Sequence, residues 1–306
     1  MARSKTRNRI KRTNEEKIIV TFAVIISVFI FLFTAYPLYY SVIYALSEGR
    51  AAMVTQIYFL PVDFTLENFQ MVFSDSALFS GLRMSVLRTS VGVVSGVFFT
   101  SMVAYALTRE ELRFRRVYAI IAIITMYFGG GVIPTFLVYR ALMITNTFWV
   151  MILPGMLNVF HMLLVMAFFR ELPDALFESA KIDGAGEFRI FLAIALPLSK
   201  PVLATIGLFA GVHHWNDWFV PTFFTAGTDF HTLPVMLMRL ITTAEAQARL
   251  AESMAQLGVA RARDQGMTVM SIRYATMVVS ILPILFVFPF VQRFFSKGIM
   301  IGSVKA

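Results

Sequence analysis

Cysteine is absent from this chain of 306 residues, so disulfide bonds, thiolate metal sites and cysteine nucleophiles are excluded. Charged side chains are also scarce: they make up 15% of the residues, against roughly 25% in soluble domains. No stretch has the form GxxxxGK(S/T), and the chain therefore has no P-loop with which to bind ATP. These absences argue against a soluble domain and against a P-loop nucleotidase.

Apolar residues take the place of the missing charge, at 58% of the chain with a mean hydropathy of +0.73. A bilayer core about 30 Å thick needs about 20 apolar residues for each helical span. Counting such runs predicts an all-α membrane protein with six transmembrane helices. We expect the spans at residues 18–45, 86–107, 117–139, 148–169, 198–219 and 272–290.

The first apolar run follows a basic segment, residues 1–17, and a cleaved signal peptide is the alternative interpretation. The run is longer than the core of a typical signal peptide, which has about 7–15 residues. No small-x-small cleavage site closes it, since Tyr36-Pro37-Leu38 lies where one is needed. We therefore expect a retained span that is kinked near Pro37.

Glycine and proline interrupt the third span, where Gly129–Gly131 is followed closely by Pro134. Because both residue types weaken a helix, the break must lie inside protein or line a cavity. Two interpretations stay open: Gly130 belongs to a hinge that bends during gating, or the glycines admit a neighbouring helix. Outside the spans, Thr65 is expected to cap a short amphipathic helix, and residues 241–257 to form another.

The basic residues are distributed unevenly along the chain. Both ends of the chain, residues 109–116 and the loop 170–200 hold 18 of the 27 lysines and arginines, whereas the acidic residues divide equally. By the positive-inside rule, residues 1–17, the loop 170–200 and the tail 291–306 are therefore cytoplasmic. Orientation of the spans also accounts for the pI of about 9.9, so we expect no nucleic-acid partner.

The loop 170–200 lies between two spans, and its residues predict two short helices. Pro173 suits the first turn of a helix because its missing N–H has no intrahelical partner there. Gly184 and Gly186 can take positive φ, so the first helix is expected to end just before them. A second helix is expected over residues 187–196. Together these helices would form a stiff projection on the cytoplasmic side.

The order of residues in this loop resembles the EAA motif of ATP-binding-cassette (ABC) importer permeases. The matching residues are Glu178-Ser179-Ala180, Asp183-Gly184-Ala185, Ile194, Leu196 and Pro197, at the family's spacing. Ser179 stands where the family usually has a second alanine, which is a small-for-small change. The chain is also similar to the maltose-G-like branch of carbohydrate permeases at residues 64–69, 129–138, 215–221 and 293–305.

This resemblance implies a type I ABC importer permease fold and one half of the pore of a bacterial, ATP-driven oligosaccharide importer. It implies that the motif helix contacts an ATPase subunit and acts as a lever that couples ATPase closure to alternating access. The contact residues would be Glu178, Ser179, Ala180, Asp183 and Gly184. The tail would approach the same ATPase through Lys297, Gly298 and Lys305, with a frayed C-terminus as the alternative.

The same resemblance implies the partners of the chain. They are a second permease subunit in a heterodimer, two ATPase subunits that hold ATP and Mg, an extracytoplasmic sugar-binding protein, membrane lipid and the oligosaccharide. The chain itself would bind no cofactor and catalyse no reaction. It would lie in the bacterial cytoplasmic (inner) membrane as a multi-pass protein.

Polar side chains gather in the fifth span, and a rise of about 1.5 Å per residue from Leu198 places His213 roughly 22 Å along it. An ionisable group at the bilayer centre costs about 2.5–3.5 kcal/mol or more, so these groups must face protein, water or an interface. Two interpretations stay open, a gate or sugar pathway and packing against the partner subunit. The candidate pathway residues are Asn158, His161, Trp215, Asn216, Asp217 and Gly130.

Two alternatives concern single residues of this group. Asn158 and His161, three residues apart, could instead form hydrogen bonds between helices. A metal site at His213 and His214 is not expected, because adjacent residues on a helix point about 100° apart and no thiol supports them.

The alternative function is an ion- or proton-coupled secondary transporter, in which His213, His214 and Asp217 relay charge. The repeated pair of broken spans that is usual in such transporters is not evident in the sequence. A membrane enzyme is less consistent still, because the acids gather in one loop and no nucleophile lies beside a base. Neutral and acidic oligosaccharides both stay open as substrates.

Overall fold

The computed structural model describes residues 13–55, 57–74, 76–240, 242–243, 246 and 268–298. Regular structure in these residues is helical, and an isolated β-bridge joins Ser47 and Phe64. The chain divides into two compact units, residues 1–68 with 265–278 and residues 69–264 with 279–306.

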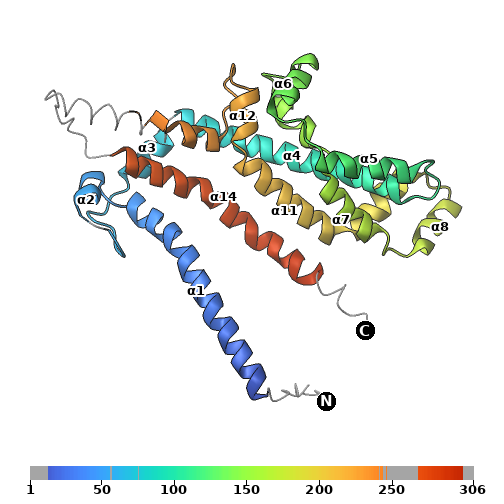
Figure 1. Cartoon of the computed structure of the whole chain (residues 1–306), viewed down its shortest axis with the longest axis horizontal. Helices are drawn as coiled ribbons and strands as arrows, with labels where there is room; N and C mark the ends of the chain where they lie inside the picture. Colours follow the sequence, from blue (N-terminus) through green and yellow to red (C-terminus); the bar gives the residue numbers. More distant parts are fainter. Residues whose placement is uncertain are drawn as a thin grey trace. The chain divides into compact units, whose positions relative to one another are not determined.

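The helices are labelled in Figure 1. In chain order they are α1 (Asn14–Ala45), α2 (Gly49–Val54), α3 (Glu67–Ser74), α4 (Ser76–Thr108), α5 (Arg115–Tyr127), α6 (Val132–Ala141), the 3-10 helices η1 (Phe148–Met151) and η2 (Leu153–Gly155), α7 (Val159–Phe169), α8 (Asp174–Ile182), α9 (Glu187–Ile190), the π-helical η3 (Phe191–Ala195), α10 (Leu196–Leu198), α11 (Lys200–Asn216), α12 (Phe219–Phe224) and α14 (Val269–Gly298).

The first unit is built on α1, a helix of 32 residues that is about 48 Å long at 1.5 Å per residue. A capping box starts it, because the Thr13 hydroxyl accepts from the Glu16 N–H and the Glu16 carboxylate accepts from the Thr13 N–H. Its far end is buried, and Tyr44 packs there on Tyr274 with ring centroids 4.5 Å apart. The Asn68 amide donates to the carbonyls of Ala45 and Ser47, both at 2.9 Å, and so fixes the start of α3.

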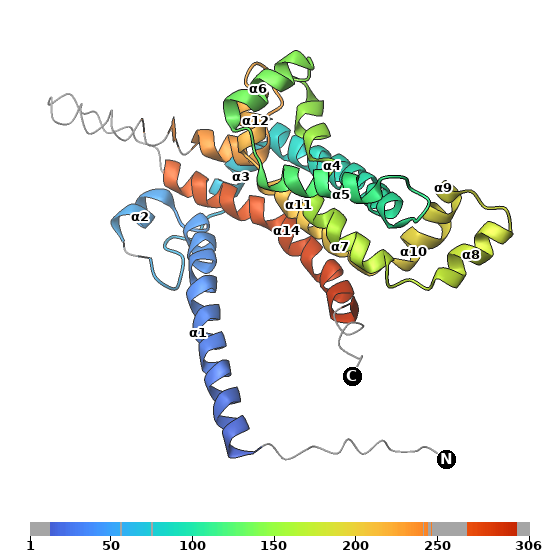
Figure 2. The same ribbon diagram turned by 45° about the vertical axis from the view of Figure 1, so that its right-hand side comes forward.

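The second unit is organised around α4, a helix of 33 residues that packs along α11 and α7 (Figures 1 and 2). Small residues let these helices approach closely, since helix association in membranes depends on packing at short range. On α11, a side chain added at Gly207 or Gly211 would already touch Val93 of α4, at 3.8 and 3.6 Å. The buried small residues of α4 include Gly81, Ser85, Gly92, Gly96, Thr100 and Ala104.

Aromatic side chains form the core where α4 ends. Tyr105 of α4 is 5% exposed and contacts Phe169 of α7, Phe177 of α8 and Phe191 of η3, with ring centroids 6.0, 6.4 and 5.4 Å apart. Ile190 of α9 belongs to the same cluster. The loop 170–200 is therefore packed against the helices of this unit rather than projecting freely into solvent.

Three of the described helical segments are long and apolar enough to cross a membrane: α1, α4 and residues 270–289 of α14. Two bent pairs raise the number to five if each pair is one span: η1–η2 with α7, at 45°, and α9–α10 with α11, at 84°. The predicted third span corresponds to α5 and α6, which are separated at residues 128–131, as the glycines there predict. The count of six spans and the cytoplasmic termini stay predictions.

The predicted second and fourth spans can be compared with the helices at their positions. The span predicted at 148–169 coincides with η1, η2 and α7, but it is bent by 45°, with 3-10 turns up to Gly155 and α7 beginning at Val159. The second span was expected to begin at residue 86, whereas α4 begins at Ser76. Arg88 lies inside both the predicted span and α4, and its charge is paired within the protein.

The remaining sequence predictions concern surface helices and the tail. The Thr65 hydroxyl accepts from the Glu67 N–H at 3.2 Å at the start of α3, so the predicted cap is confirmed. The predicted helix over residues 241–257 lies almost entirely outside the described residues. Lys305 of the tail also lies outside them. Lys297 and Gly298 form the end of α14.

Candidate functional site

Helix α8 carries the motif residues of the loop 170–200, and its ends follow from local chemistry. Pro173 is the N-cap, Asp174 lies in the first turn, and Asp183 is the C-cap. Gly184 then adopts a φ of +75°, a left-handed conformation that costs other residues roughly 1–2 kcal/mol. Gly186 instead has a φ of −72° and begins α9 as its N-cap. Of the two glycines, Gly184 alone requires the absence of a side chain.

The motif residues lie mainly on the exposed side of α8. Glu178, Ser179, Asp183 and Gly184 are exposed, whereas Ala180 is half-buried against the core. Ile182, on the same helix, is 86% exposed, a high value for a large apolar side chain beside charged neighbours. An apolar side chain rimmed by polar groups matches the anatomy of protein interfaces, which have an apolar centre and a polar rim.

The opposite face of α8 is anchored by Phe177, which the sequence analysis does not single out. Phe177 is 3% exposed and packs on Tyr105 at the end of α4. The Arg109 guanidinium lies over both rings, with its Cζ 4.2 Å from the centroid of Phe177 and 4.7 Å from that of Tyr105. In the sequence, the one sign that Phe177 is buried is that it is a large aromatic residue among charged ones. Its partners Tyr105 and Arg109 could not be identified from the sequence, because they lie about 70 residues away in the chain.

An ionic contact lies one turn further along the same face. The Lys181 ammonium donates to the Glu111 carboxylate in the α4–α5 connection and lies 2.9 Å from Oε1 of Glu187 in α9. The hydrogen bond between Lys181 and Glu111 raises the pKa of Lys181 and lowers the pKa of Glu111. Oε2 of Glu187 accepts from the Tyr105 hydroxyl at 2.6 Å. Helix α8 is thus tied to α4 by both apolar and polar contacts.

A buried ion pair joins α4 to the end of α11. The Arg88 side chain is 1% exposed, pairs with the Asp217 carboxylate, and donates from Nη1 to the Asp217 carbonyl at 2.9 Å. Asp217 Oδ1 also accepts from the N–H groups of Phe219 and Val220, at 2.9 and 3.2 Å, and so caps α12. Sequence reasoning missed Arg88, although a lone arginine at the edge of an apolar run is a recognised signal.

Two other residues near the end of α11 are buried for structural reasons. The His214 imidazole is 5% exposed and packs on Gly92 of α4, leaving no room there for a side chain. Gly155 lies near the His214 Cε1, which a Cβ at Gly155 would meet at 3.8 Å. Trp215 is 7% exposed, and its Nε1 donates to the Ser280 carbonyl of α14 at 3.1 Å. His214 and Trp215 therefore face protein, whereas the adjacent His213 and Asn216 are exposed.

A stripe of polar and aromatic side chains, four of them exposed and His161 half-buried, follows α11 and the start of α7. We define it as Asn158, His161, Phe209, His213 and Asn216. The His161 ring stacks on Phe209, with centroids 6.0 Å apart. His213 and Asn216 follow Phe209 on one helical face and are exposed.

The structure corrects the sequence reading of Asn158 within this stripe. Asn158 was expected inside a helix, but it is the N-cap of α7, and its Oδ1 accepts from the His161 N–H at 3.0 Å. The Asn158 N–H donates to Thr100 Oγ1 of α4 at 3.3 Å. The stripe is therefore held against α4 through the Asn158 backbone, while Phe209, His213 and Asn216 are exposed on α11.

Gly130 lies in the exposed break between α5 and α6, apart from the stripe in the sequence. A Cβ built on Gly130 meets only Pro134 within 4 Å, and one built on Gly129 meets nothing among the described residues. Gly131 has a φ of +79°, which explains one of the three glycines. Close packing of a described helix on Gly130 is therefore not observed.

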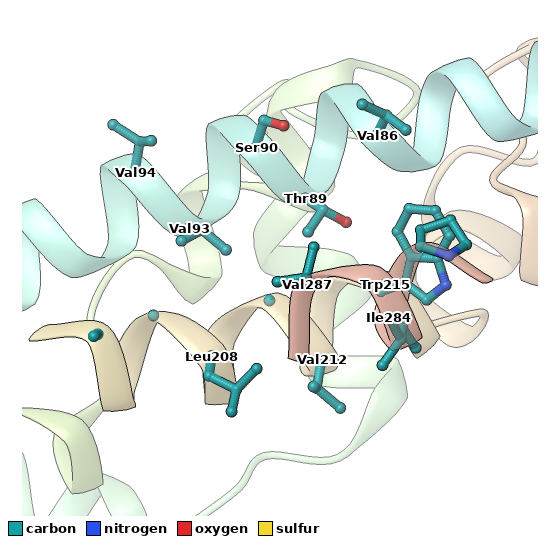
Figure 3. A pocket seen from close by; sticks show the side chains of 14 residues that line it. Val86, Thr89, Ser90, Val93, Val94, Leu208, Val212, Trp215, Ile284 and Val287 are labelled. Carbon is teal, nitrogen blue, oxygen red and sulfur yellow. The ribbon is translucent and has the colours of Figure 1, made fainter. Parts of the chain in front are cut away.

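A pocket of about 570 Å³ lies between α4, α11 and the second-unit part of α14 (Figure 3). Aliphatic side chains such as Val93, Leu208 and Ile284 form most of its walls, with Thr89 and Ser90 as the hydroxyl-bearing residues. A sugar needs many hydrogen-bond partners, so this chemistry suits apolar groups better than an oligosaccharide.

Comparison with known proteins identifies the family of this chain. The model of the inner membrane component of binding-protein-dependent transport systems matches residues 77–301. The chain belongs to this family. Family membership makes the chain a permease subunit, as the resemblance implied, and rules out the alternative of an ion-coupled secondary transporter.

Relatives of known name agree with this family. Protein LplC of Bacillus subtilis (strain 168) is 36% identical over 272 residues, covering 89% of this chain and 90% of its own. YtcP of the same organism, a polygalacturonan/rhamnogalacturonan transport system permease protein, is 34% identical over 246 residues, covering 80% and 84%. The matched family is a transport-system membrane component and YtcP is named a permease protein, so this chain is not an enzyme and ATP hydrolysis belongs to partner subunits.

A solved structure extends the agreement to the fold. One chain of a bacterial ABC transporter involved in the import of the acidic polysaccharide alginate matches with a TM-score of 0.81 and 27% identity. The match covers 94% of this chain and 99% of that chain. The fold of the chain is therefore that of an ABC importer permease.

Proposed function

We propose that this chain forms one half of the membrane pore of a bacterial, ATP-driven importer and carries an oligosaccharide across the cytoplasmic membrane. Family membership supports the proposal, because the family belongs to binding-protein-dependent transport systems. The implied partners are a second permease subunit, two ATPase subunits with ATP and Mg, and an extracytoplasmic sugar-binding protein.

Acidic oligosaccharides are the substrates that we would test first. YtcP is named for polygalacturonan and rhamnogalacturonan, and the structural neighbour for alginate. These polymers all carry uronic acids. The stripe agrees with such a ligand, because it offers imidazoles, carboxamides and an aromatic ring and contains no carboxylate that would repel it.

The difference in exposure between the two sides of helix α8 is the observation that supports the coupling part of the proposal. Its exposed side presents Glu178, Ser179, Asp183 and the apolar Ile182, while Phe177 holds the other side on the core. We infer that an ATPase subunit binds this exposed side and displaces α8 when it closes on ATP. The displacement would then open the pore alternately to the two sides of the membrane.

The stripe is the part of the chain that we assign to the sugar pathway. Exposed polar side chains in a membrane-spanning region must face water, substrate or a partner, since lipid offers them no hydrogen bonds. Aromatic faces with adjacent hydrogen-bonding groups suit a sugar. Asp217 and Trp215 instead have partners within this chain, so we assign them to holding the end of α11 in place.

Substitution at Gly184 tests the coupling proposal, with Gly186 as a matched control. A Cβ meets nothing within 4 Å at either glycine, so only the backbone conformation distinguishes the two sites. At Gly184 the positive φ makes Gly184→Val distort the end of α8, whereas Gly186→Val fits a φ of −72°.

The measurements are co-purification of the ATPase with the permease and sugar uptake by proteoliposomes per ATP hydrolysed. We expect Gly184→Val to lower the uptake per ATP, or to release the ATPase, and Gly186→Val to behave as wild type. Intact coupling in Gly184→Val would refute the assignment of α8 to the ATPase contact.

A further inference from the structure

Lys181 is the side chain on which several segments around the loop converge. It contacts Glu111 in the α4–α5 connection and Glu187 in α9, and Glu187 in turn accepts from the Tyr105 hydroxyl of α4. Helix α8, helix α9, the α4–α5 connection and α4 itself are thereby joined through one ammonium group and its partners.

Phe177 provides a second contact on the same face of α8, because residues four apart on a helix lie side by side. It is buried against Tyr105 and lies beneath the Arg109 guanidinium, whose Cζ is 4.2 Å from the ring centroid. A single contact would let α8 pivot about it. Two contacts one turn apart, one apolar and one ionic, restrict that rotation.

Exposure indicates what the ionic contact contributes. The Lys181 side chain is 38% exposed, and those of Glu111 and Glu187 are 63% and 48% exposed. Ion pairs this exposed add little to folding stability, because water screens them and ordering long side chains costs entropy. Their consequence is geometric: they fix the direction of α8 relative to the end of α4.

We propose that Lys181, together with Phe177, makes α8 and the end of α4 one rigid body, so that a displacement of α8 moves α4. The proposal rests on the coupling role of α8 proposed above. Helix α4 carries Thr100, which binds the Asn158 backbone at the start of the stripe. Movement of α4 would therefore reach the pathway directly. Lys181 is a positioning residue in this scheme and touches neither the sugar nor ATP.

The first experiment measures sugar imported per ATP hydrolysed by the full importer in proteoliposomes. We expect Lys181→Met to lower this ratio by about three- to fivefold, since it removes two weak ion pairs, while ATPase co-purification is unchanged. Lys181→Arg keeps the charge and should restore most of the ratio. Lys200→Met is the matched control, because Lys200 lies in the same loop and forms no ion pair with any described residue.

A double-mutant cycle separates the contact from a general effect of charge. Glu111→Gln alone should lower the ratio less than Lys181→Met, because Glu187 still holds Lys181. The double variant should be no worse than Lys181→Met alone. Strictly additive losses, or an unchanged ratio in Lys181→Met, would overturn the proposal.

The second experiment measures the distance between α8 and α4 directly. The chain contains no cysteine, so cysteines introduced at the exposed Ala175 of α8 and Ala106 of α4 can be spin-labelled before assembly without background from this subunit. We expect one narrow distance distribution in wild type that is the same with and without ATP, and a broader one in Lys181→Met. A shift of the wild-type distance on adding ATP would show that α8 moves apart from α4 and would overturn the proposal.

Failure of the coupling role itself gives a different result. If α8 does not contact the ATPase, Gly184→Val retains coupled uptake. The label distance between Ala175 and Ala106 still reports whether the two helices form one body, so the two ideas can fail independently.

Discussion

Adding one methyl group at Gly92 tests the close approach of α4 and α11 at His214. A Cβ at Gly92 would lie 2.5, 2.7 and 2.8 Å from three ring atoms of His214. The imidazole would have to move by about 1 Å to regain ordinary contact. It has little freedom to do so, because His214 is 5% exposed and the adjacent Trp215 is held by its hydrogen bond to the Ser280 carbonyl.

The expected magnitude follows from comparison with Gly96, one turn further along α4. A Cβ at Gly96 would lie 3.8 and 3.9 Å from the Gly155 and Met156 carbonyl oxygens, where it fits. Replacing glycine by alanine inside a helix gains about 1 kcal/mol of helix propensity at either site, so this gain cancels in the comparison. Overpacking at Gly92 costs about 1–3 kcal/mol. We therefore expect Gly92→Ala to be less stable than Gly96→Ala by that amount.

Thermal unfolding in detergent at a fixed scan rate measures this difference, since unfolding of such proteins is commonly irreversible. A difference of 1 kcal/mol corresponds to about 2–4 °C in Tm for chains of 150–250 residues. The control repeats Gly92→Ala in a His214→Ala background, where the imidazole ring is absent. In that background Gly92→Ala should lower the Tm much less than it does in the wild-type protein. Equal Tm values for Gly92→Ala and Gly96→Ala would refute the packing argument.

The other predictions concern polar contacts. Arg88→Met leaves the Asp217 carboxylate without its partner and should cost about 3–5 kcal/mol, whereas combining it with Asp217→Asn should cost less than the sum of the single changes; chemical unfolding in detergent measures both. Thr100→Val removes the hydrogen bonds to the Met156 carbonyl, 2.9 Å, and from the Asn158 N–H, 3.3 Å, and should lower stability by about 1–3 kcal/mol, while Thr100→Ser keeps both bonds and its stability. The lowered pKa of Glu111 means that its contact with Lys181 is fully formed above the ordinary carboxyl pKa and is lost as pH falls through the lowered value. The raised pKa of Lys181 means that the contact is fully formed below the ordinary lysine pKa and is lost only as pH rises through the raised value. The label distance between α8 and α4 should therefore be unchanged between about pH 6 and pH 9, and a change within that range would contradict the assignment of this contact.

Local chemistry explains why much of the loop was predictable. The bounds of α8 follow from Pro173, Asp183 and Gly184, because proline, a carboxylate and a glycine each act on the backbone within one turn. The break between α5 and α6 follows in the same way from its glycines. The order of the motif residues was sufficient to recognise the family, although the contacts of those residues with partners stay predictions.

The interior of the spans was less predictable where polar groups are paired inside the protein. Arg88 lies within the predicted second span, but hydropathy does not reveal that Asp217 pairs with it. Asn158 was read as a residue of a continuous helix, whereas its carboxamide starts a new one by capping α7. In both cases the deciding interaction is a hydrogen bond that composition does not reveal.

By itself, the sequence determined that this chain is a multi-helical membrane permease with a structured polar loop, because apolar length and short-range capping are local properties. Only the tertiary structure decided which residues of that loop face inward and which side chains of α4 and α11 are paired. Phe177 is packed by Tyr105 and Arg109, and Arg88 binds a residue 129 positions away. Such contacts leave no periodic signal in one sequence, since the partners are chosen by the packing of helices rather than by their neighbours in the chain.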